Sequence, residues 1–272
     1  MREKTQTFFG MTGPAFTRPP KLPYLDPARE KAIEQLRNLI QRRGFSVLTA
    51  PPGCGKTAIL HYLSKELSDN HHKVIYVPFS FLEKGQMLSF ISAKMGLETK
   101  RGIAGTISAI QKYLHDIQPV NPVIIIDEIE HMDVETTHII RLIANDRQDT
   151  TFHCTLILAG DDSFVEQKLR LHINEPLRQR ITLYARLQPL DHHHSKLYID
   201  HCLSYVGASE LFDMQAIQLI HELTNGVPRI INTLAEAAID LAAEHNLRTV
   251  TLDHVHEAAA SALPPQSLQV LS

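Results

Sequence analysis

A glycine-rich loop stands between an aliphatic run and a helical pattern, and it limits the folds open to this chain. The run is Phe45 to Thr49, and the loop that follows is Ala50-Pro51-Pro52-Gly53-Cys54-Gly55-Lys56-Thr57. In a strand–loop–helix unit of this kind, backbone N–H groups of the loop and the helix N-terminus bind phosphate oxygens. The sequence therefore predicts a Walker A loop, although Ala50 replaces the glycine usual at its first position.

The loop assigns roles to individual residues. We expect Lys56 to neutralise charge on the β- and γ-phosphates of ATP and to assist catalysis, and the Thr57 hydroxyl to ligate Mg²⁺. The other cofactor-binding positions are expected to be Pro52, Gly53, Cys54, Gly55 and Ala58. ATP and Mg²⁺ are thus the predicted cofactors.

A second motif follows about 70 residues later in the chain, Val123-Ile124-Ile125-Ile126-Asp127-Glu128. A buried parallel strand reads as a continuous aliphatic run, and it ends at the sheet edge where ligands bind. We interpret this segment as a Walker B strand. Asp127 would then hold the Mg²⁺ shell, and Glu128 would act as the general base toward the attacking water.

The rest of the first part of the chain alternates strand and helix patterns. Short apolar runs at 45–49, 73–79, 122–127, 154–159 and 181–187 are separated by helical patterns, starting with a helix from Pro27 to about Arg43. This alternation predicts an α/β fold, a parallel five-stranded P-loop sheet with helices on both faces. After Leu190 only helical patterns follow, beginning near Asp191, Asp213, Pro228 and Thr251, which predicts a small all-helical domain.

Composition predicts how these parts are divided. Residues 1–26 are rich in proline and aromatic side chains and are expected to form an extended arm. We expect the nucleotide-binding domain at 27–190, the helical domain at 191–263 and a flexible tail at 264–272.

The charge and hydropathy of the chain restrict where it acts. The net charge is −3, with the basic residues concentrated before residue 45, so bulk charge does not predict strong nucleic-acid binding. The longest aliphatic run is far shorter than the ~20 residues of a membrane helix, and no apolar signal segment begins the chain. These features predict a cytoplasmic protein without a membrane partner.

Several further segments resemble the ExeA-like AAA+ ATPases, a family similar to the TnsC and MuB transposition regulators. The resemblance covers nearly the whole chain and rests on Phe9-Gly10-Met11 through Phe16, Tyr24-Leu25, Leu187-Gln188-Pro189-Leu190, Tyr198-Ile199-Asp200-His201 and Gly226-Val227-Pro228-Arg229-Ile230-Ile231-Asn232. The resemblance implies that the nucleotide binds between the α/β domain and a helical lid. It also implies that the protein forms homo-oligomers in which a neighbouring subunit completes each nucleotide site.

The resemblance also implies roles for arginines. Arg229 matches the lid arginine, called sensor 2, that touches the nucleotide phosphates, although a surface arginine would fit the same position. Arg180 best matches the arginine finger, with Arg178 as the alternative; either would stabilise transferred phosphoryl charge in trans, or simply pair with surface acids. Asp161 stands where the family places a neutral polar sensor 1 residue, and a carboxylate there would be repelled by the γ-phosphate unless it contacts Mg²⁺ or a cation. This departure predicts slow hydrolysis.

The resemblance favours a DNA-associated function. Lys84 and Thr99-Lys100-Arg101 match stretches through which TnsC-like proteins follow a DNA backbone, although cations at helix ends would look the same. The expected function is an ATP-dependent regulator that assembles as a ring or filament on double-stranded DNA and recruits a transposase. A secretion-pathway ATPase of the ExeA type, expected to carry a membrane segment and a wall-binding part, is one alternative. An ATP-driven protein switch without a DNA role is the other.

Overall fold

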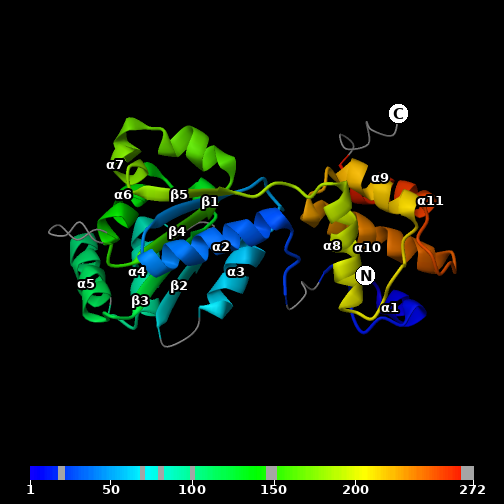
Figure 1. Ribbon diagram of the computed structural model, residues 1–272, viewed down its shortest axis with the longest axis horizontal. Coiled ribbons are helices and arrows are strands. Elements are labelled where there is room, and N and C mark those ends of the chain that lie inside the picture. Colours follow the sequence, from blue (N-terminus) through cyan, green and yellow to red (C-terminus); the bar gives the residue numbers. More distant parts are fainter. Residues whose placement is uncertain (18–21, 68–70, 79–82, 99–101, 145–151, 265–272) are drawn as a thin grey trace. The chain divides into compact units, whose positions relative to one another are not determined.

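The computed structural model describes residues 1–17, 22–67, 71–78, 83–98, 102–144 and 152–264. The chain divides into two compact units (Figure 1). One unit comprises Pro27–Pro52 and Lys56–Leu187, and the other comprises Met1–Asp26, Gly53–Gly55 and Gln188–Ser272. The tail predicted at 264–272 lies outside the described residues, except for Pro264.

The first unit is built on a parallel sheet of five strands, which confirms the predicted α/β fold. The strands lie in the order β2-β3-β4-β1-β5, and every neighbouring pair is parallel. They are β1 Phe45–Thr49, β2 His72–Pro78, β3 Asn121–Asp127, β4 Thr155–Gly160 and β5 Ile181–Arg186. Strands β1, β3 and β4 occupy the middle of the sheet and are buried along their whole length, as their continuous aliphatic runs require.

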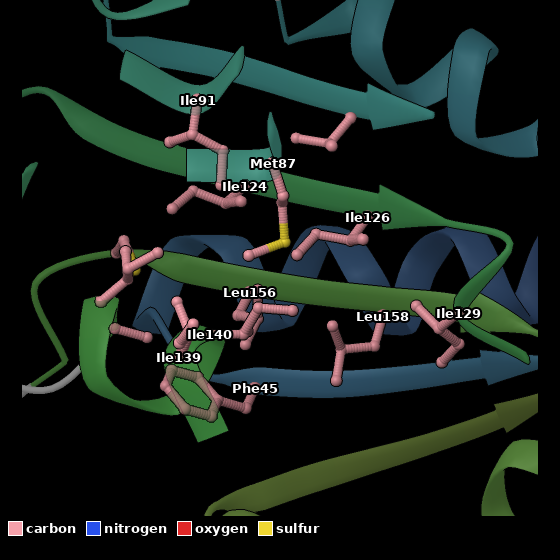
Figure 2. Packing of buried hydrophobic residues seen from close by; sticks show 14 of the residues in the cluster. Phe45, Met87, Ile91, Ile124, Ile126, Ile129, Ile139, Ile140, Leu156 and Leu158 are labelled. Atoms are coloured by element: carbon pink, nitrogen blue, oxygen red, sulfur yellow. The ribbon is translucent and has the colours of Figure 1, made fainter. Parts of the chain in front are cut away.

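Helices cover both faces of this sheet. In the described residues the α-helices of the first unit are α2 Pro27–Arg42, α3 Lys56–Glu66, α4 Lys84–Lys94, α5 Ile103–Asp116, α6 Val134–Ile143 and α7 Glu175–Arg178, and Phe164–Leu169 forms a π-helix. Helices α4, α5 and α6 share one core with alternate strand residues, because successive side chains of a strand point to opposite faces. Figure 2 shows Met87 and Ile91 of α4 packed over Ile124 and Ile126 of β3. Helix α2 packs on β1 and β5 and against α3.

The second unit is helical after residue 190. Its helices there are α8 His192–Ser204, α9 Met214–Thr224, α10 Pro228–Glu244 and α11 Leu252–Ala262. They begin where the sequence predicts. The carboxylates of Asp191 and Asp213 accept N–H groups of the first turns of α8 and α9, and Pro228 opens α10.

Close backbone packing explains one glycine of this unit. Gly226 has a φ of +69°, and a Cβ built there would lie 1.8 Å from the carbonyl oxygen of Leu190. The Leu190 N–H in turn donates to the Gly226 carbonyl at 2.9 Å. A side chain would separate the two segments, so the start of α10 can reach the segment before α8 only with glycine at this position.

The N-terminal segment differs from the expected extended arm, because Glu3–Phe9 forms helix α1. The prolines that favoured an arm all follow residue 13, whereas Glu-Lys-Thr-Gln-Thr-Phe-Phe contains no helix breaker. Gly10 then ends the helix in the left-handed conformation, with a φ of 70°. None of the helices in the described ranges is long and apolar enough to cross a bilayer.

Candidate nucleotide site

The Walker A loop joins the carboxyl end of β1 to the first turn of α3. Lys56 and Thr57 are the first residues of α3, so their side chains lie at a helix N-terminus, where N–H groups have no partner within the helix. Gly53 and Gly55 have φ values of 84° and 91°, which side-chain-bearing residues rarely adopt. The Ala50 N–H donates to the Gly160 carbonyl at 3.3 Å and thereby ties the loop to the end of β4.

The Lys56 ammonium lies over its own loop. Its Nζ donates to the Ala50 carbonyl oxygen at 2.8 Å. A cation at a helix N-terminus opposes the positive end of the helix dipole, so an anion bound there would relieve this unfavourable arrangement. The loop can therefore bind a phosphate. Pro52 of the loop and Ala58 in the first turn of α3 are exposed, and the Cys54 side chain is fully buried.

The Asp127 carboxylate collects three hydrogen bonds at the end of β3. The Thr57 hydroxyl and the Tyr76 hydroxyl both donate to Oδ2 at 2.7 Å, and the Glu128 N–H donates to Oδ1 at 2.9 Å. Asp127 is 3% exposed. The two proposed metal-binding residues, Thr57 and Asp127, thus lie in direct contact although they are 70 positions apart in sequence.

These oxygens fit Mg²⁺. Magnesium prefers hard oxygen ligands, and it is usually held through one or two protein oxygens together with waters and substrate phosphates. A hydroxyl and a carboxylate joined beside a phosphate-binding loop supply that set. The Tyr76 phenol is the additional member of the cluster. Its burial, and next the charge of Asp127, raise the pKa of Tyr76 far above its usual value, so the hydroxyl keeps its proton as a donor.

Glu128 follows directly and has an unusual backbone. Its φ of 62° and ψ of 39° are left-handed, and the residue directly precedes the short 3-10 helix Ile129–His131. Such a conformation is uncommon for a side-chain-bearing residue and is found at functional sites. Glu128 lines a surface pocket beside the Asp127 cluster. The pocket is formed by Thr57, His61, Tyr76, Pro78, Phe90, Lys94, Asp127 and Glu128.

Asp161 follows the end of β4, where the resemblance to the family predicts a sensor 1 residue. The Asp161 carboxylate accepts hydrogen bonds from the N–H and the hydroxyl of Ser163. These two bonds within the local turn stabilise its negative charge. The Asp161 N–H donates to Glu130 Oε2 at 3.2 Å. A Cβ at Gly160 would lie 2.5 Å from that same carboxylate oxygen and 2.6 Å from Ile129 Cγ1, so a side chain there would displace Glu130 or Ile129.

Lysine 168 fixes the segment that follows the Walker B strand. Lys168 Nζ donates to the carbonyl oxygens of Glu130 at 2.5 Å and Met132 at 2.6 Å. Both carbonyls belong to the turn that begins at Glu128. Tyr76, Glu130 and Lys168 were not predicted from the sequence, because their partners lie in segments distant along the chain. The third acid of Asp127-Glu128-Ile129-Glu130 is a signal that could have suggested Glu130.

The three candidate arginines are held differently. Arg178 pairs with Glu175 within α7, whereas Arg180 donates through Nη1 to the Pro176 carbonyl at 3.1 Å. Arg229 is the second residue of α10 and is exposed. Its backbone N–H donates to the Gly53 carbonyl at 3.2 Å, and by its contacts Gly53 belongs to the same compact unit.

The candidate DNA contacts are only partly described. Lys84 opens α4 and forms an exposed ion pair with Glu135 of α6. This pairing raises the pKa of Lys84, mainly through the hydrogen bond to Glu135, and compensates its charge. Thr99, Lys100 and Arg101 lie outside the described residues.

Comparison with known proteins agrees with this geometry. Residues 37–169 match the family model described as an AAA domain. The chain is 27% identical to General secretion pathway protein A of Aeromonas hydrophila over 240 residues. This alignment covers 85% of this chain and 44% of that protein. The chain therefore spans less than half the length of this relative.

Solved structures share the fold. Cdc6p from Pyrobaculum aerophilum superposes with a TM-score of 0.76 at 16% identity, over 98% of this chain and 73% of that one. The Aeropyrum pernix ORC1 protein in complex with DNA gives 0.69 at 18% identity, over 96% of this chain and 70% of that one. At these identities the likeness concerns the fold alone. The P-loop fold and the family match together support an AAA+ ATPase.

Proposed function

We propose that this chain binds ATP with Mg²⁺ and hydrolyses it. The observation that carries the proposal is the direct contact between Thr57 and Asp127, at 2.7 Å, beside a loop that carries Lys56. This contact brings the hydroxyl of the Walker A motif to the carboxylate of the Walker B motif, as phosphoryl-transfer sites require. Mg²⁺ held by Thr57 and Asp127 would neutralise part of the charge of the phosphates.

The residues of the chain then divide the work. Lys56 and the loop N–H groups hold the phosphates, while Asp127, directed by its three hydrogen bonds, presents its remaining acceptor to the metal shell. Glu128 takes the proton of the attacking water. Arg229 would contact the phosphates as a rigid cationic fork from the start of α10. Asp161, turned toward Ser163, offers no neutral donor to the γ-phosphate, which fits slow turnover.

Assembly is proposed to complete the site. Arg180 is the better candidate for the arginine finger. Arg178 is already paired with the Glu175 carboxylate of its own helix, whereas the hydrogen bond of Arg180 goes to the neutral Pro176 carbonyl. A guanidinium can leave a neutral acceptor more readily than a charged one. We therefore expect Arg180 of one subunit to contact the γ-phosphate of the ATP that is bound to a second copy of the chain.

Replacing Arg180 with alanine should leave ATP binding by the isolated subunit nearly intact and reduce turnover in the assembly about a hundredfold, because the lost donor acts only on transition-state charge. ATP binding is measured by fluorescent-nucleotide titration and turnover by phosphate release. The exposed Arg42, at the end of α2, provides a matched control. Mixing Arg180→Ala with Glu128→Gln subunits should restore activity at some sites, and no recovery at any ratio would argue against composite sites.

We further propose that the assembly is a ring or filament on double-stranded DNA that acts as an accessory ATPase of transposition, with a transposase as its partner. The support is the resemblance of the sequence and the fold shared with an ORC1 protein solved with DNA. Phosphate contacts would come from Lys84, Thr99, Lys100 and Arg101, repeated in each subunit, which multiplies a weak local contact.

ATP should therefore promote binding to duplex DNA with little sequence preference, and the affinity should fall steeply with salt because each cation releases counterions. Replacing Lys84 and Lys100 with alanine should weaken binding and lower the salt slope by about one per cation removed. Glu135→Gln should strengthen DNA binding, since it frees Lys84 from its ion pair. These affinities are measured by fluorescence anisotropy at several salt concentrations, with ATP affinity as the control.

A second candidate function is favoured by the relative from Aeromonas hydrophila, whose name assigns it to the general secretion pathway. In that case, or in an ATP-driven switch that acts on a protein, the ATPase residues keep their roles and the DNA contacts do not exist. The ion pair between Lys84 and Glu135 agrees with this alternative, because it neutralises the Lys84 charge that would otherwise attract DNA. Absence of duplex binding at low salt in the presence of ATP would decide against the DNA proposal and for this alternative.

A further inference from the structure

Tyr76 reaches the Asp127 carboxylate from a neighbouring strand. In the sheet, β2 pairs with β3 so that Tyr76 lies opposite Ile125 and Pro78 lies opposite Asp127. The phenol therefore extends along the sheet toward its carboxyl edge, and its hydroxyl lies 2.7 Å from Asp127 Oδ2. The Thr57 hydroxyl lies at the same distance from the same oxygen. Two hydroxyl groups from β2 and α3 thus converge on one carboxylate oxygen of β3.

The Tyr76 ring is itself held in place. The imidazole of His61 stacks on it, with ring centroids 4.6 Å apart and an angle of 23° between the planes. His61 lies one turn after Thr57 on α3, so a single helix provides both the metal-binding hydroxyl and the stacking partner. Stacking against the imidazole restricts the rotation of the Tyr76 ring and so holds the phenol hydroxyl toward Asp127.

We propose that Tyr76 is a positioning residue of the magnesium site, which orients the Asp127 carboxylate and thereby raises the affinity for Mg²⁺ in the nucleotide complex. The inference rests on the proposed ATPase function and adds a residue that the Walker motifs do not contain.

The acceptor capacity of the carboxylate supports this role. An ionised carboxylate has about four lone-pair sites. Thr57 and Tyr76 donate to Oδ2, and the Glu128 N–H donates to Oδ1, so the remaining acceptor site lies on Oδ1. Without the phenol, Oδ2 would lose one of its two donors and the carboxylate would rotate more freely. Metal binding would then have to order the carboxylate, which costs free energy. The phenol lowers this cost because it orders the carboxylate before the metal binds.

The chemistry of the pair also agrees, because the phenol hydroxyl donates to Asp127 Oδ2 at 2.7 Å. The hydrogen bond to a charged acceptor is of the stronger, charge-assisted kind.

The test is the variant Tyr76→Phe, which keeps the ring stacked on His61 and removes only the hydroxyl. The Mg²⁺ concentration for half-maximal binding of fluorescent ATP should rise about tenfold, the effect typical of losing a partner of a metal ligand. ATP affinity measured in EDTA and the melting temperature should stay at wild-type values. Binding of Mn²⁺ in the nucleotide complex, followed by electron paramagnetic resonance, should weaken in parallel.

Controls separate this role from a structural one. Tyr113→Phe, on α5, removes a phenol hydroxyl from a different part of the same unit and should not shift the Mg²⁺ midpoint. His61→Ala should shift it in the same direction as Tyr76→Phe, and His61→Phe, which retains a ring to stack, should shift it less.

Each outcome has a distinct meaning. Equal Mg²⁺ midpoints for wild type and Tyr76→Phe would overturn the positioning role while leaving the ATPase proposal standing. A loss of ATP affinity in EDTA equal to the loss in Mg²⁺ would also overturn it, because the hydroxyl would then support the fold of the loop. A wild-type chain that binds no nucleotide in Mg²⁺ would overturn the proposed function and this inference together.

Discussion

Replacing Lys56 with alanine should weaken ATP binding about a thousandfold, equivalent to about 4 kcal/mol, because the triphosphate would lose the main side-chain cation of its loop. Lys56 lies at the start of α3, and its ammonium is 2.8 Å from the Ala50 carbonyl oxygen. We expect the ammonium to exchange this contact for a phosphate oxygen when ATP binds. Alanine has no substitute for it, and the N–H groups of the helix terminus would face the anion alone. A fluorescent-ATP titration measures the change.

The control for this variant lies on the same helix. Lys65→Ala removes an exposed lysine from the last turn of α3, far from the loop, and should leave ATP affinity unchanged. Since alanine favours a helix at least as well as lysine, neither substitution should unfold α3. Unchanged affinity of Lys56→Ala would refute the phosphate-binding assignment of the loop.

The sequence predicts those elements whose signal is local. Continuous aliphatic runs identify the middle strands because buried parallel strands must be apolar on both faces. Asp191 and Asp213 identify helix starts because a carboxylate accepts the free N–H groups of a first turn. The contact between Thr57 and Asp127 joins two motifs that each follow the carboxyl end of a parallel strand, and such ends lie at one edge of the sheet.

Contacts between distant elements escape such reasoning. Tyr76 reads as an ordinary strand residue until the strand order places β2 beside β3. The pairing of Lys84 with Glu135 joins α4 to α6 and likewise depends on the fold. Helix α1 was missed for a different reason, since averaging composition over 26 residues let the later prolines obscure a helical stretch before them. For Asp161 a local signal was present, because Ser163 two residues later favours a turn that engages the carboxylate.

Replacing Glu128 with glutamine should keep ATP binding and reduce hydrolysis about a thousandfold, because an amide cannot accept the proton of the attacking water. The Asp127 cluster should survive, since the hydrogen bond from Glu128 to Asp127 comes from the backbone N–H, which glutamine retains. The left-handed backbone at Glu128 is likewise unaffected by this nearly isosteric change. The ATP-bound form should therefore accumulate, visible as nucleotide that remains unhydrolysed on the purified assembly.

Phosphate release and nucleotide titration on the same preparation separate loss of chemistry from loss of binding. Glu135→Gln, an exposed acid on α6, makes the matched amide substitution outside the site and should hydrolyse ATP at the wild-type rate. A wild-type rate in Glu128→Gln would mean that another group takes the proton. Glu130 would not be an obvious replacement, because its carboxylate already accepts the Asp161 N–H at the end of β4. That result would move the search for the base to the partner subunit or to the phosphates themselves.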